Sequence, residues 1–420
     1  MSIFLNLDKT QLLKVFTLLS PSARFNLLIL FGAGLLFWSG LASLLPTLPL
    51  YIQSAGANSQ QVGMVMGCFA IGLLASRAWL AKLTDRAGRK CVLLIGMGAI
   101  ALAPLGYCVT ASLPLLMLLR AFHGISIAAF ALAYSALVVD LSPPQNRGEL
   151  IGYMSLVNPL GLAIGPALGG FLQEWFNFQV VFLMSAGMGM LGLMCTAKVR
   201  ECPTPKNPNA AIASNQFWAL LMDARIRVPA VIMLLVGLSF GTLSTFVPLY
   251  IKSVGAELNV GLFYTAVAIA SFGVRLVAGP GSDRYGRGPF ITISLILYTL
   301  AMLLLWQATS AELFLLAAVI QGAGSGTIIP MVAALMADRS FPHERGRTFG
   351  VCMVGFDLGL ALAGPLLGTV ADQVGYANLF GFCGGLTGLG ILIFLTCSSK
   401  DVAHSLRFAL GRGRDVYAVD

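Results

Sequence analysis

Apolar runs of about 20 residues recur along this chain and are separated by short polar breaks. A helix of about 20 apolar residues crosses a bilayer core of about 30 Å, and 57% of the 420 residues are hydrophobic. Helices and closed barrels satisfy their backbone groups in lipid, and these runs lack the period-two alternation of barrel strands. We therefore predict an all-α, polytopic membrane protein. The twelve expected transmembrane helices are 25–49, 60–81, 91–111, 113–139, 149–173, 177–197, 229–251, 259–281, 289–309, 312–337, 346–371 and 376–397.

The positions of the positive charges predict the orientation of the chain. If the N-terminus is cytoplasmic, 22 of the 26 Lys and Arg residues fall in cytoplasmic segments. Cytoplasmic loops of membrane proteins carry this excess, so we predict that both termini are cytoplasmic, in an inner or plasma membrane. Orientation thus explains the net charge of +9, and we expect no nucleic-acid partner.

The second half of the sequence repeats the first. LPLYIQSAGA at 48–57 returns as VPLYIKSVGA at 247–256, and RAWLAKLTDRAGRK at 77–90 returns as RLVAGPGSDRYGRG at 275–288, at offsets of 199 and 198. A parallel duplication predicts two pseudo-symmetric six-helix bundles about an axis along the membrane normal, with a substrate site between them near the midplane. Two bundles that rock against each other can expose one site to either side in turn, which favours a carrier.

The repeat and the polar breaks divide the chain into five expected segments. The linker includes FWALLMDARIR at 217–227, for which we expect a surface helix, and apolar residues of the N-terminal arm are spaced as one face of an interfacial helix. The segments are an N-terminal cytoplasmic arm (1–24), an N-terminal bundle (25–197), a central cytoplasmic linker (198–228), a C-terminal bundle (229–397) and a cytoplasmic tail (398–420).

Other classes of protein find little support in the sequence. The eight cysteines lie mostly within or at the ends of apolar runs and lack metal-ligand spacing, so we expect apolar filler and no metal site. The sequence shows no nucleophile with a plausible base, no HExxH and no phosphate-binding glycine loop, which argues against a membrane enzyme and against a cofactor. A transport-silent receptor is a further alternative, but its expected soluble domain does not fit the short outer loops. We expect a monomer.

Charged residues gather in LTDRAGRK at 83–90, between two apolar runs, and this pattern returns in the second half. With the twelve runs, it resembles the major facilitator superfamily over essentially the whole chain, and most of all its twelve-span, proton-coupled drug efflux branch. The family's loop pattern is G-x-x-x-D-R-x-G-R-K, from which Ala81 and Gly288 depart. The matching residues are Asp85, Arg86, Gly88, Arg89 and Lys90, and then Asp283, Arg284, Gly286 and Arg287.

The resemblance implies that these two loops form a cytoplasmic gate. It implies that Asp85 contacts the start of span 11 and Asp283 the start of span 5, where a helix N-terminus favours a carboxylate. We expect the loop arginines to bridge to Asp140 and Asp338 at the ends of spans 4 and 10. These contacts would break when the bundles rotate, so the loops would hold one of two conformations. A role in topology alone is the alternative, although topology requires neither loop aspartate.

Few ionisable residues lie within the spans, which makes each one a candidate for function. Arg120 opens RAFHG at 120–124, which resembles the family's span 4 pattern R-x-x-x-G. The resemblance implies a role in proton transfer, and a fixed cation can depress the proton affinity of a nearby acid. Asp357 lies about 16 Å into span 11, close to the midplane, and is the expected acid. A structural role for Asp357 is the alternative.

Three further ionisable residues admit structural interpretations. His123 stands where the family usually has Gln, and it either titrates near neutrality or makes a structural hydrogen bond. Arg77 and Arg275 lie eight residues before the loop aspartates, and we expect both to extend toward the cytoplasmic surface.

The run GLAIGPALGG at 161–170 matches the family's exporter pattern G-x-x-x-G-P-x-x-G-G, through Gly161, Gly165, Pro166, Gly169 and Gly170. Glycines allow helices to approach closely, and the proline frees a backbone carbonyl. The second half retains only part of this pattern, so ordinary helix packing is an alternative reading. The full match favours export over uptake.

The expected cavity helices carry aromatic residues and few fixed charges, which suggests an amphipathic or lipophilic cargo. We predict a proton-coupled antiporter that exports such a small molecule by alternating access, with protons and membrane lipid as its other partners. A lipid or glycolipid flippase and a sugar exporter of the same superfamily are the alternatives. The candidate cavity residues are Trp38, Phe130, Tyr134, Asn158, Phe240, Thr245 and Gln321.

Overall fold

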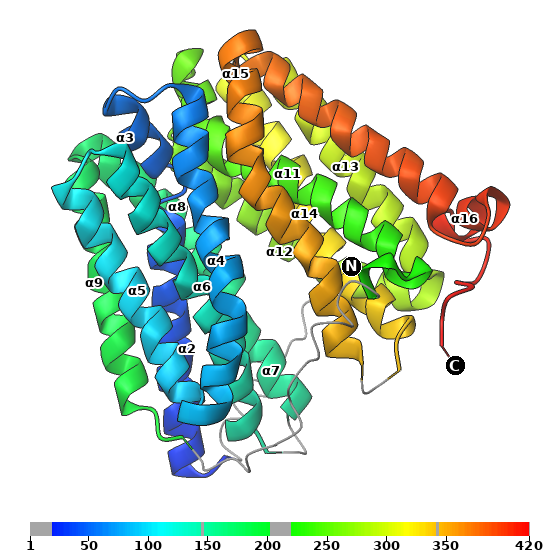
Figure 1. The fold of residues 1–420 in the computed structure, drawn as a ribbon, viewed down its shortest axis with the longest axis horizontal. Helices are drawn as coiled ribbons and strands as arrows, with labels where there is room; N and C mark the ends of the chain where they lie inside the picture. Colours follow the sequence, from blue (N-terminus) through cyan, green and yellow to red (C-terminus); the bar gives the residue numbers. More distant parts are fainter. Residues whose placement is uncertain (1–18, 144–146, 202–219, 342–343, 420) are drawn as a thin grey trace, which may run out of the picture.

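The computed structural model describes residues 19–143, 147–201, 220–341 and 344–419, apart from the side chain of Asp85. All regular structure in these ranges is helical (Figure 1). The N-terminal arm before residue 19 and the greater part of the central linker lie outside the described residues, and so do the interfacial helix expected in the arm and the first residues of the surface helix expected at 217–227.

The helices follow the apolar runs closely. In the first half they are α2 (Pro21–Ser43), α3 (Leu48–Ser54), α4 (Ser59–Ala87), α5 (Arg89–Val109), α6 (Leu113–Leu141), α7 (Arg147–Ser155), α8 (Val157–Trp175) and α9 (Phe178–Lys198). In the second half they are α11 (Ala224–Ser253), α12 (Val260–Tyr285), α13 (Arg287–Trp306), α14 (Ala311–Asp338), α15 (Arg345–Cys397) and α16 (Val402–Ala409). The fifth expected span is divided between α7 and α8.

The described residues contain 11 helices long and apolar enough to cross a membrane, against the twelve predicted spans. The difference comes from α15, whose 53 residues hold both of the last two spans. Gly375 separates them, because its φ of 79° lies outside the helical region and suits a residue without a Cβ. The seventh span also begins at Ala224, five residues earlier than expected at 229, because the Asp223 side chain caps α11 there.

Helix packing repeats between the two halves. In the first half α4 packs on α6, and α2 packs on α8 and α9; in the second half α12 packs on α14, and α11 packs on α15. The halves meet along two seams, one between α4 and α15 and the other between α8 and α12 (Figure 1). Each seam joins the second helix of one repeat to the fifth of the other, as expected for a parallel duplication.

Glycines allow the backbones to meet at both seams. A Cβ added at Gly364 of α15 would lie 1.9 Å from the carbonyl oxygen of Gly63 in α4, and one added at Gly261 of α12 would lie 2.1 Å from that of Pro166 in α8. Small residues permit this close approach of membrane helices. The seams therefore depend on residues that lack a side chain.

Polar contacts between the halves gather at the end of the molecule that carries α3, here called the α3 end. The Asp372 carboxylate of α15 accepts hydrogen bonds from the backbone N–H groups of Ser59 (2.9 Å) and Gln60 (3.0 Å), at the start of α4. The Tyr376 hydroxyl contacts the Ser59 hydroxyl at 3.1 Å and accepts a 3.4 Å hydrogen bond from Gln53. Toward the opposite end, α4 and α15 run apart (Figure 1).

Candidate transport site

The end opposite α3 carries the loops that join α4 to α5 and α12 to α13, and is here called the basic end. Arg89 bridges to Asp140 at the end of α6, and Arg287 Nε lies 3.1 Å from Asp338 Oδ2 at the end of α14. These are equivalent positions of the repeat, so the predicted arginine–aspartate bridges are confirmed in both halves. Each bridge ties helices within a single half.

The start of α5 has a further partner that the sequence did not suggest. The Glu201 carboxylate accepts hydrogen bonds from the backbone N–H groups of Arg89 (2.6 Å) and Lys90 (3.2 Å). A carboxylate satisfies the free N–H groups at a helix start and interacts favourably with the helix dipole. Gly88 makes the preceding turn with a φ of 91°, and Gly286 makes the equivalent turn with a φ of 86°.

The basic loops do not join the two halves through their described side chains. The Asp283 carboxylate binds Arg287 of its own half at 2.5 Å, so the contact expected with the start of span 5 is not made in this conformation. Arg284 lies over the ring of Tyr285, and Arg86 is exposed. The Asp85 side chain lies outside the described part. The role of these loops as a gate remains a prediction.

The halves are instead joined by an ion pair inside the membrane region. Arg77 Nη1 of α4 lies 2.7 Å from Asp357 Oδ2 of α15, and the Asp357 side chain is only 6% exposed. Among the described residues, this ion pair alone connects the two halves. A buried carboxylate requires a cation or hydrogen-bond donors, and the adjacent helix α4 supplies one.

Neither arginine expected to extend to the cytoplasmic surface does so. Arg77 pairs with Asp357, and Arg275 Nε donates a 3.1 Å hydrogen bond to the carbonyl oxygen of Gly326 in α14. Both predictions were wrong, because each side chain has an acceptor on a neighbouring helix at its own depth. No pattern in the sequence indicates which helix faces meet.

Arg120 lies in a separate polar cluster on α4, α5 and α6. Its guanidinium carbon stands 4.5 Å from the centre of the Phe69 ring, and the side chain lies near the Tyr107 hydroxyl. That hydroxyl is also 3.1 Å from Nδ1 of His123, which is completely buried. Asp357 therefore forms its ion pair with Arg77 and not with Arg120.

Gln321 is the counterpart of His123 in the repeat, at an offset of 198. It is 1% exposed and lies near the buried Tyr298, while His123 contacts Tyr107. A tyrosine thus lies near both residues, although Tyr107 and Tyr298 are not equivalent positions of the repeat. Gln321 lines neither of the two cavities described next.

Two cavities share Trp38 in their walls, and Arg120 lines the first of them. The first, here called the central cavity, has a volume of about 130 Å³ and lies between the halves, with Trp38 and Arg120 on one side and Phe240 and Thr245 on the other. The second, called the side cavity, has a volume of about 290 Å³ and lies within the first half among α2, α6, α7 and α8. Trp38 borders both cavities.

The side cavity has an aromatic wall. Phe130 stacks on Phe37 and on Tyr134, with ring centres 4.0 and 4.6 Å apart, and Trp38 meets Phe130 edge to face. Asn158 also lines this cavity. The structure thus places Trp38, Phe130, Tyr134, Asn158, Phe240 and Thr245 in cavity walls. Contact of these residues with a cargo remains a prediction.

The candidate exporter motif lies where α8 meets α2 and α12. Cβ atoms added at Gly165 and Gly169 would come within 2.4 and 2.1 Å of carbonyl oxygens of α2, and one added at Gly161 would meet Trp38 at 2.3 Å. Gly170 instead faces Gly261 of α12 in the other half, and the Thr265 hydroxyl donates a 2.8 Å hydrogen bond to Ala163. The motif therefore packs one helix against both halves.

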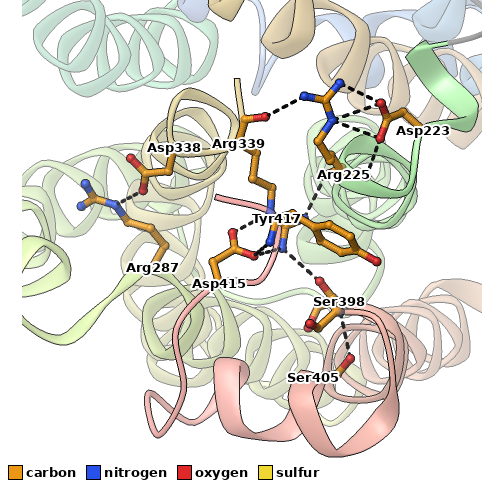
Figure 2. A network of polar contacts seen from close by, with 10 residues as sticks. Asp223, Arg225, Arg287, Asp338, Arg339, Ser398, Ser405, Asp415 and Tyr417 are labelled. Atoms are coloured by element: carbon orange, nitrogen blue, oxygen red, sulfur yellow. Dashed lines mark hydrogen bonds and ion pairs between the residues drawn. The ribbon is translucent and has the colours of Figure 1, made fainter. Parts of the chain in front are cut away.

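A polar network at the basic end fastens the C-terminal tail to the second half (Figure 2). Arg339, just after α14, is completely buried and lies 2.6 and 3.0 Å from the two carboxylate oxygens of Asp415. It also donates to the carbonyl oxygens of Arg225 (2.9 Å) and Ser398 (3.0 Å). The tail thus links the start of α11 to the ends of α14 and α15.

Two packed helical halves, close glycine seams and a cavity between them define a polytopic membrane transporter. The family profile described as Major Facilitator Superfamily matches residues 30–284 and again 231–413. The chain therefore belongs to the major facilitator superfamily, which makes it a membrane transporter rather than an enzyme.

Several relatives match over most of the chain. The staphylopine export protein of Staphylococcus aureus is 26% identical over 388 residues, which cover 89% of this chain and 96% of the relative. The multi-drug resistance efflux pump PmrA of Streptococcus pneumoniae is 26% identical over 380 residues, with 84% and 91% covered. The nucleoside transporter NupG superposes with a TM-score of 0.76 at 14% identity, covering 88% of this chain and 98% of NupG, and supports the fold alone.

Proposed function

We propose that this protein is a proton-coupled antiporter that exports an amphipathic small molecule by alternating access. The observation that carries the proposal is the buried ion pair between Arg77 and Asp357, which joins the two halves inside the membrane region. A group that carries protons through such a carrier must sit where the halves separate and meet again. Asp357 occupies such a position.

The depth of the ion pair fits this role. Asp357 lies 12 residues from the start of α15 and Arg77 lies 10 residues from the end of α4, so both are roughly 15 to 18 Å from the basic end. The excess of Lys and Arg assigns that end to the cytoplasm. With the α3 end held by Asp372 and Tyr376, the conformation described here would face the cytoplasm.

Proton exchange follows from the separation of the pair. In the cytoplasm-facing state, Arg77 stabilises the ionised Asp357. When the halves rotate and α4 moves away from α15, the carboxylate loses its cation, and an uncompensated buried charge is relieved by taking up a proton from the outer side. On return, the approaching guanidinium displaces that proton to the cytoplasm.

The energy available from one proton sets a limit on this mechanism. Converting one conformer decisively into the other takes about 5.5 kcal/mol of differential binding. A proton crossing the membrane supplies about 2.3 kcal/mol per 100 mV. Cargo binding must therefore contribute as well, which suits a cavity shared by both halves.

The relatives and the cavity walls support outward transport of an amphipathic cargo. The relatives named above are described as an export protein and as a drug efflux pump. The exporter pattern of α8 is complete and packs on both halves. The cavity walls are largely apolar and aromatic, with a few polar groups, which suits an amphipathic molecule.

Transport into proteoliposomes tests the proposal. Vesicles in which the basic end faces outward would take up an uncharged amphipathic dye faster when the lumen is acidic. In Asp357→Asn, we expect this response to the pH gradient to be lost while downhill exchange of the dye continues. Glu312→Gln changes an exposed acid at the start of α14 and serves as the matched control.

Two results would contradict the proposal. Full gradient-driven uptake by Asp357→Asn would show that this carboxylate does not carry the proton. Translocation of a fluorescent phospholipid, without dye uptake and without a change in luminal pH, would favour the flippase alternative.

A further inference from the structure

Arg120 is a buried cation without an acidic partner among the described residues. Its side chain is 7% exposed, and its Nε has no hydrogen-bond partner. The groups that face it are the Phe69 ring and the Tyr107 hydroxyl, and both are uncharged. A buried charge usually requires an ion partner, so a counter-charge is missing from this site.

Among the described residues, no other acid lies in the middle of a span to supply that counter-charge. Asp357 is the acid in the middle of a span, and it already pairs with Arg77. The other described acids lie near helix ends or in connecting segments. His123 belongs to the same cluster, but as a base it cannot neutralise a guanidinium.

Arg120 also forms part of the wall of the central cavity. Trp38 and Phe240 provide aromatic surface there, and Ser244 and Thr245 of α11 bring hydroxyl groups from the other half. A guanidinium presents a planar array of N–H donors that matches a carboxylate. The cavity therefore combines one cation with aromatic and hydroxyl surface.

The volumes suggest how a larger molecule would lie. The central cavity, at about 130 Å³, holds a small polar group, whereas drug-sized ligands take about 300 Å³ or more. The side cavity, at about 290 Å³, lies directly across Trp38 and has an aromatic wall.

We propose that Arg120 binds the single anionic group of the cargo, so that the substrate class is an aromatic monoanion such as an arylalkyl carboxylate. The inference rests on the proposed export function and specifies its substrate. The carboxylate occupies the central cavity beside Arg120, and the aromatic part extends past Trp38 toward Phe130. One unpaired cation favours one negative charge and disfavours a cationic group.

Binding to the full chain in lipid nanodiscs tests this at constant pH and without a gradient. Three probes share one ring system and differ in charge: 2-naphthylacetate, its neutral amide 2-naphthylacetamide, and 2-(2-naphthyl)ethylammonium. We expect the wild-type protein to bind the acetate at least tenfold more tightly than the amide, and to bind the ammonium most weakly. Equal affinity for acetate and amide, or preference for the ammonium, would overturn the proposal without any variant.

Variants then locate the preference. Arg120→Gln should remove the difference between acetate and amide, and Arg120→Lys should restore part of it because the charge returns without the planar donor array. Arg275→Gln is the matched control, since Arg275 lies within a span but bonds a carbonyl oxygen away from both cavities. If Arg120→Gln keeps the full preference for the acetate, the anion binds elsewhere and the assignment is wrong.

This experiment separates two kinds of failure. Loss of anion preference with intact pH-driven dye uptake would remove the substrate assignment and leave the antiporter. Anion preference without gradient-driven transport would keep the substrate assignment and remove the antiporter. A purely structural role for Arg120 predicts that Arg120→Gln weakens all three probes equally, which contradicts the proposal.

Discussion

Replacing Asp415 by Ala should destabilise the second half strongly, because it leaves Arg339 charged and buried without its carboxylate. Arg339 is 0% exposed and the Asp415 side chain is 10% exposed, so solvent screens this pair little. Removing one partner of a buried ion pair costs about 3 to 5 kcal/mol. Arg339 keeps two carbonyl acceptors, at 2.9 and 3.0 Å, so we expect the free energy of unfolding to fall by about 3 kcal/mol.

Unfolding by sodium dodecyl sulfate in mixed micelles, followed by tryptophan fluorescence, measures this loss. Asp415→Asn should lie between the wild type and the alanine variant, because the amide oxygen still accepts a hydrogen bond. Arg414→Ala changes the exposed neighbouring residue and should have little effect. A loss below about 1 kcal/mol in Asp415→Ala would refute the reasoning, because it would mean that the pair is solvated or that the tail leaves this face.

Two further predictions concern the α3 end and the entry of the chain into the second half. Asp372→Asn removes the charge that binds the start of α4, which is worth about 0.3 to 1 kcal/mol. The ratio of molecules closed at the α3 end to molecules open there should therefore fall by a factor of about two to five, as measured by electron–electron distances between spin labels on α3 and α15; unchanged distance distributions would contradict this. The pKa of Asp223, which caps α11, lies below the ordinary 3.8 because the Arg225 guanidinium hydrogen-bonds its carboxylate. The carboxylate is thus stabilised in the folded state, so its contribution is present above pH 3.8 and is lost as the pH falls through the lower folded value. Asp223→Ala should cost about 1 kcal/mol at pH 7, and this difference should shrink in unfolding measurements below pH 3.8; a cost that is constant with pH would contradict the assignment.

The spans and the duplication could be predicted because they depend on local properties. The thickness of a bilayer sets the length of each apolar run, and the repeat is visible in short segments such as 77–90 and 275–288. The bridge from Arg89 to Asp140 was also predictable, because both residues lie at the same ends of neighbouring helices. The eleventh and twelfth predicted spans both lie in α15, where the non-helical Gly375 separates them.

The ion pair between Arg77 and Asp357 could not be predicted, because its partners lie 280 positions apart on helices whose relative rotation the sequence does not specify. An arginine near a helix end can reach either the surface or a neighbouring helix, and only packing decides. The ion pair that holds the C-terminal tail could not be predicted for the same reason. Asp415 and Arg339 are 76 residues apart, and neither belongs to a repeated pattern.

The two repeats are unequal where they hold ionisable groups within the membrane. Asp357 stands opposite Asn158, and Arg120 stands opposite Ala318. The halves are related by an axis along the membrane normal, so identical halves would present the same groups to a molecule bound between them from either side. Here the halves differ, because the first supplies a guanidinium and the second supplies a carboxylate that their counterparts lack. We therefore expect an asymmetric cargo to bind between the halves in one orientation.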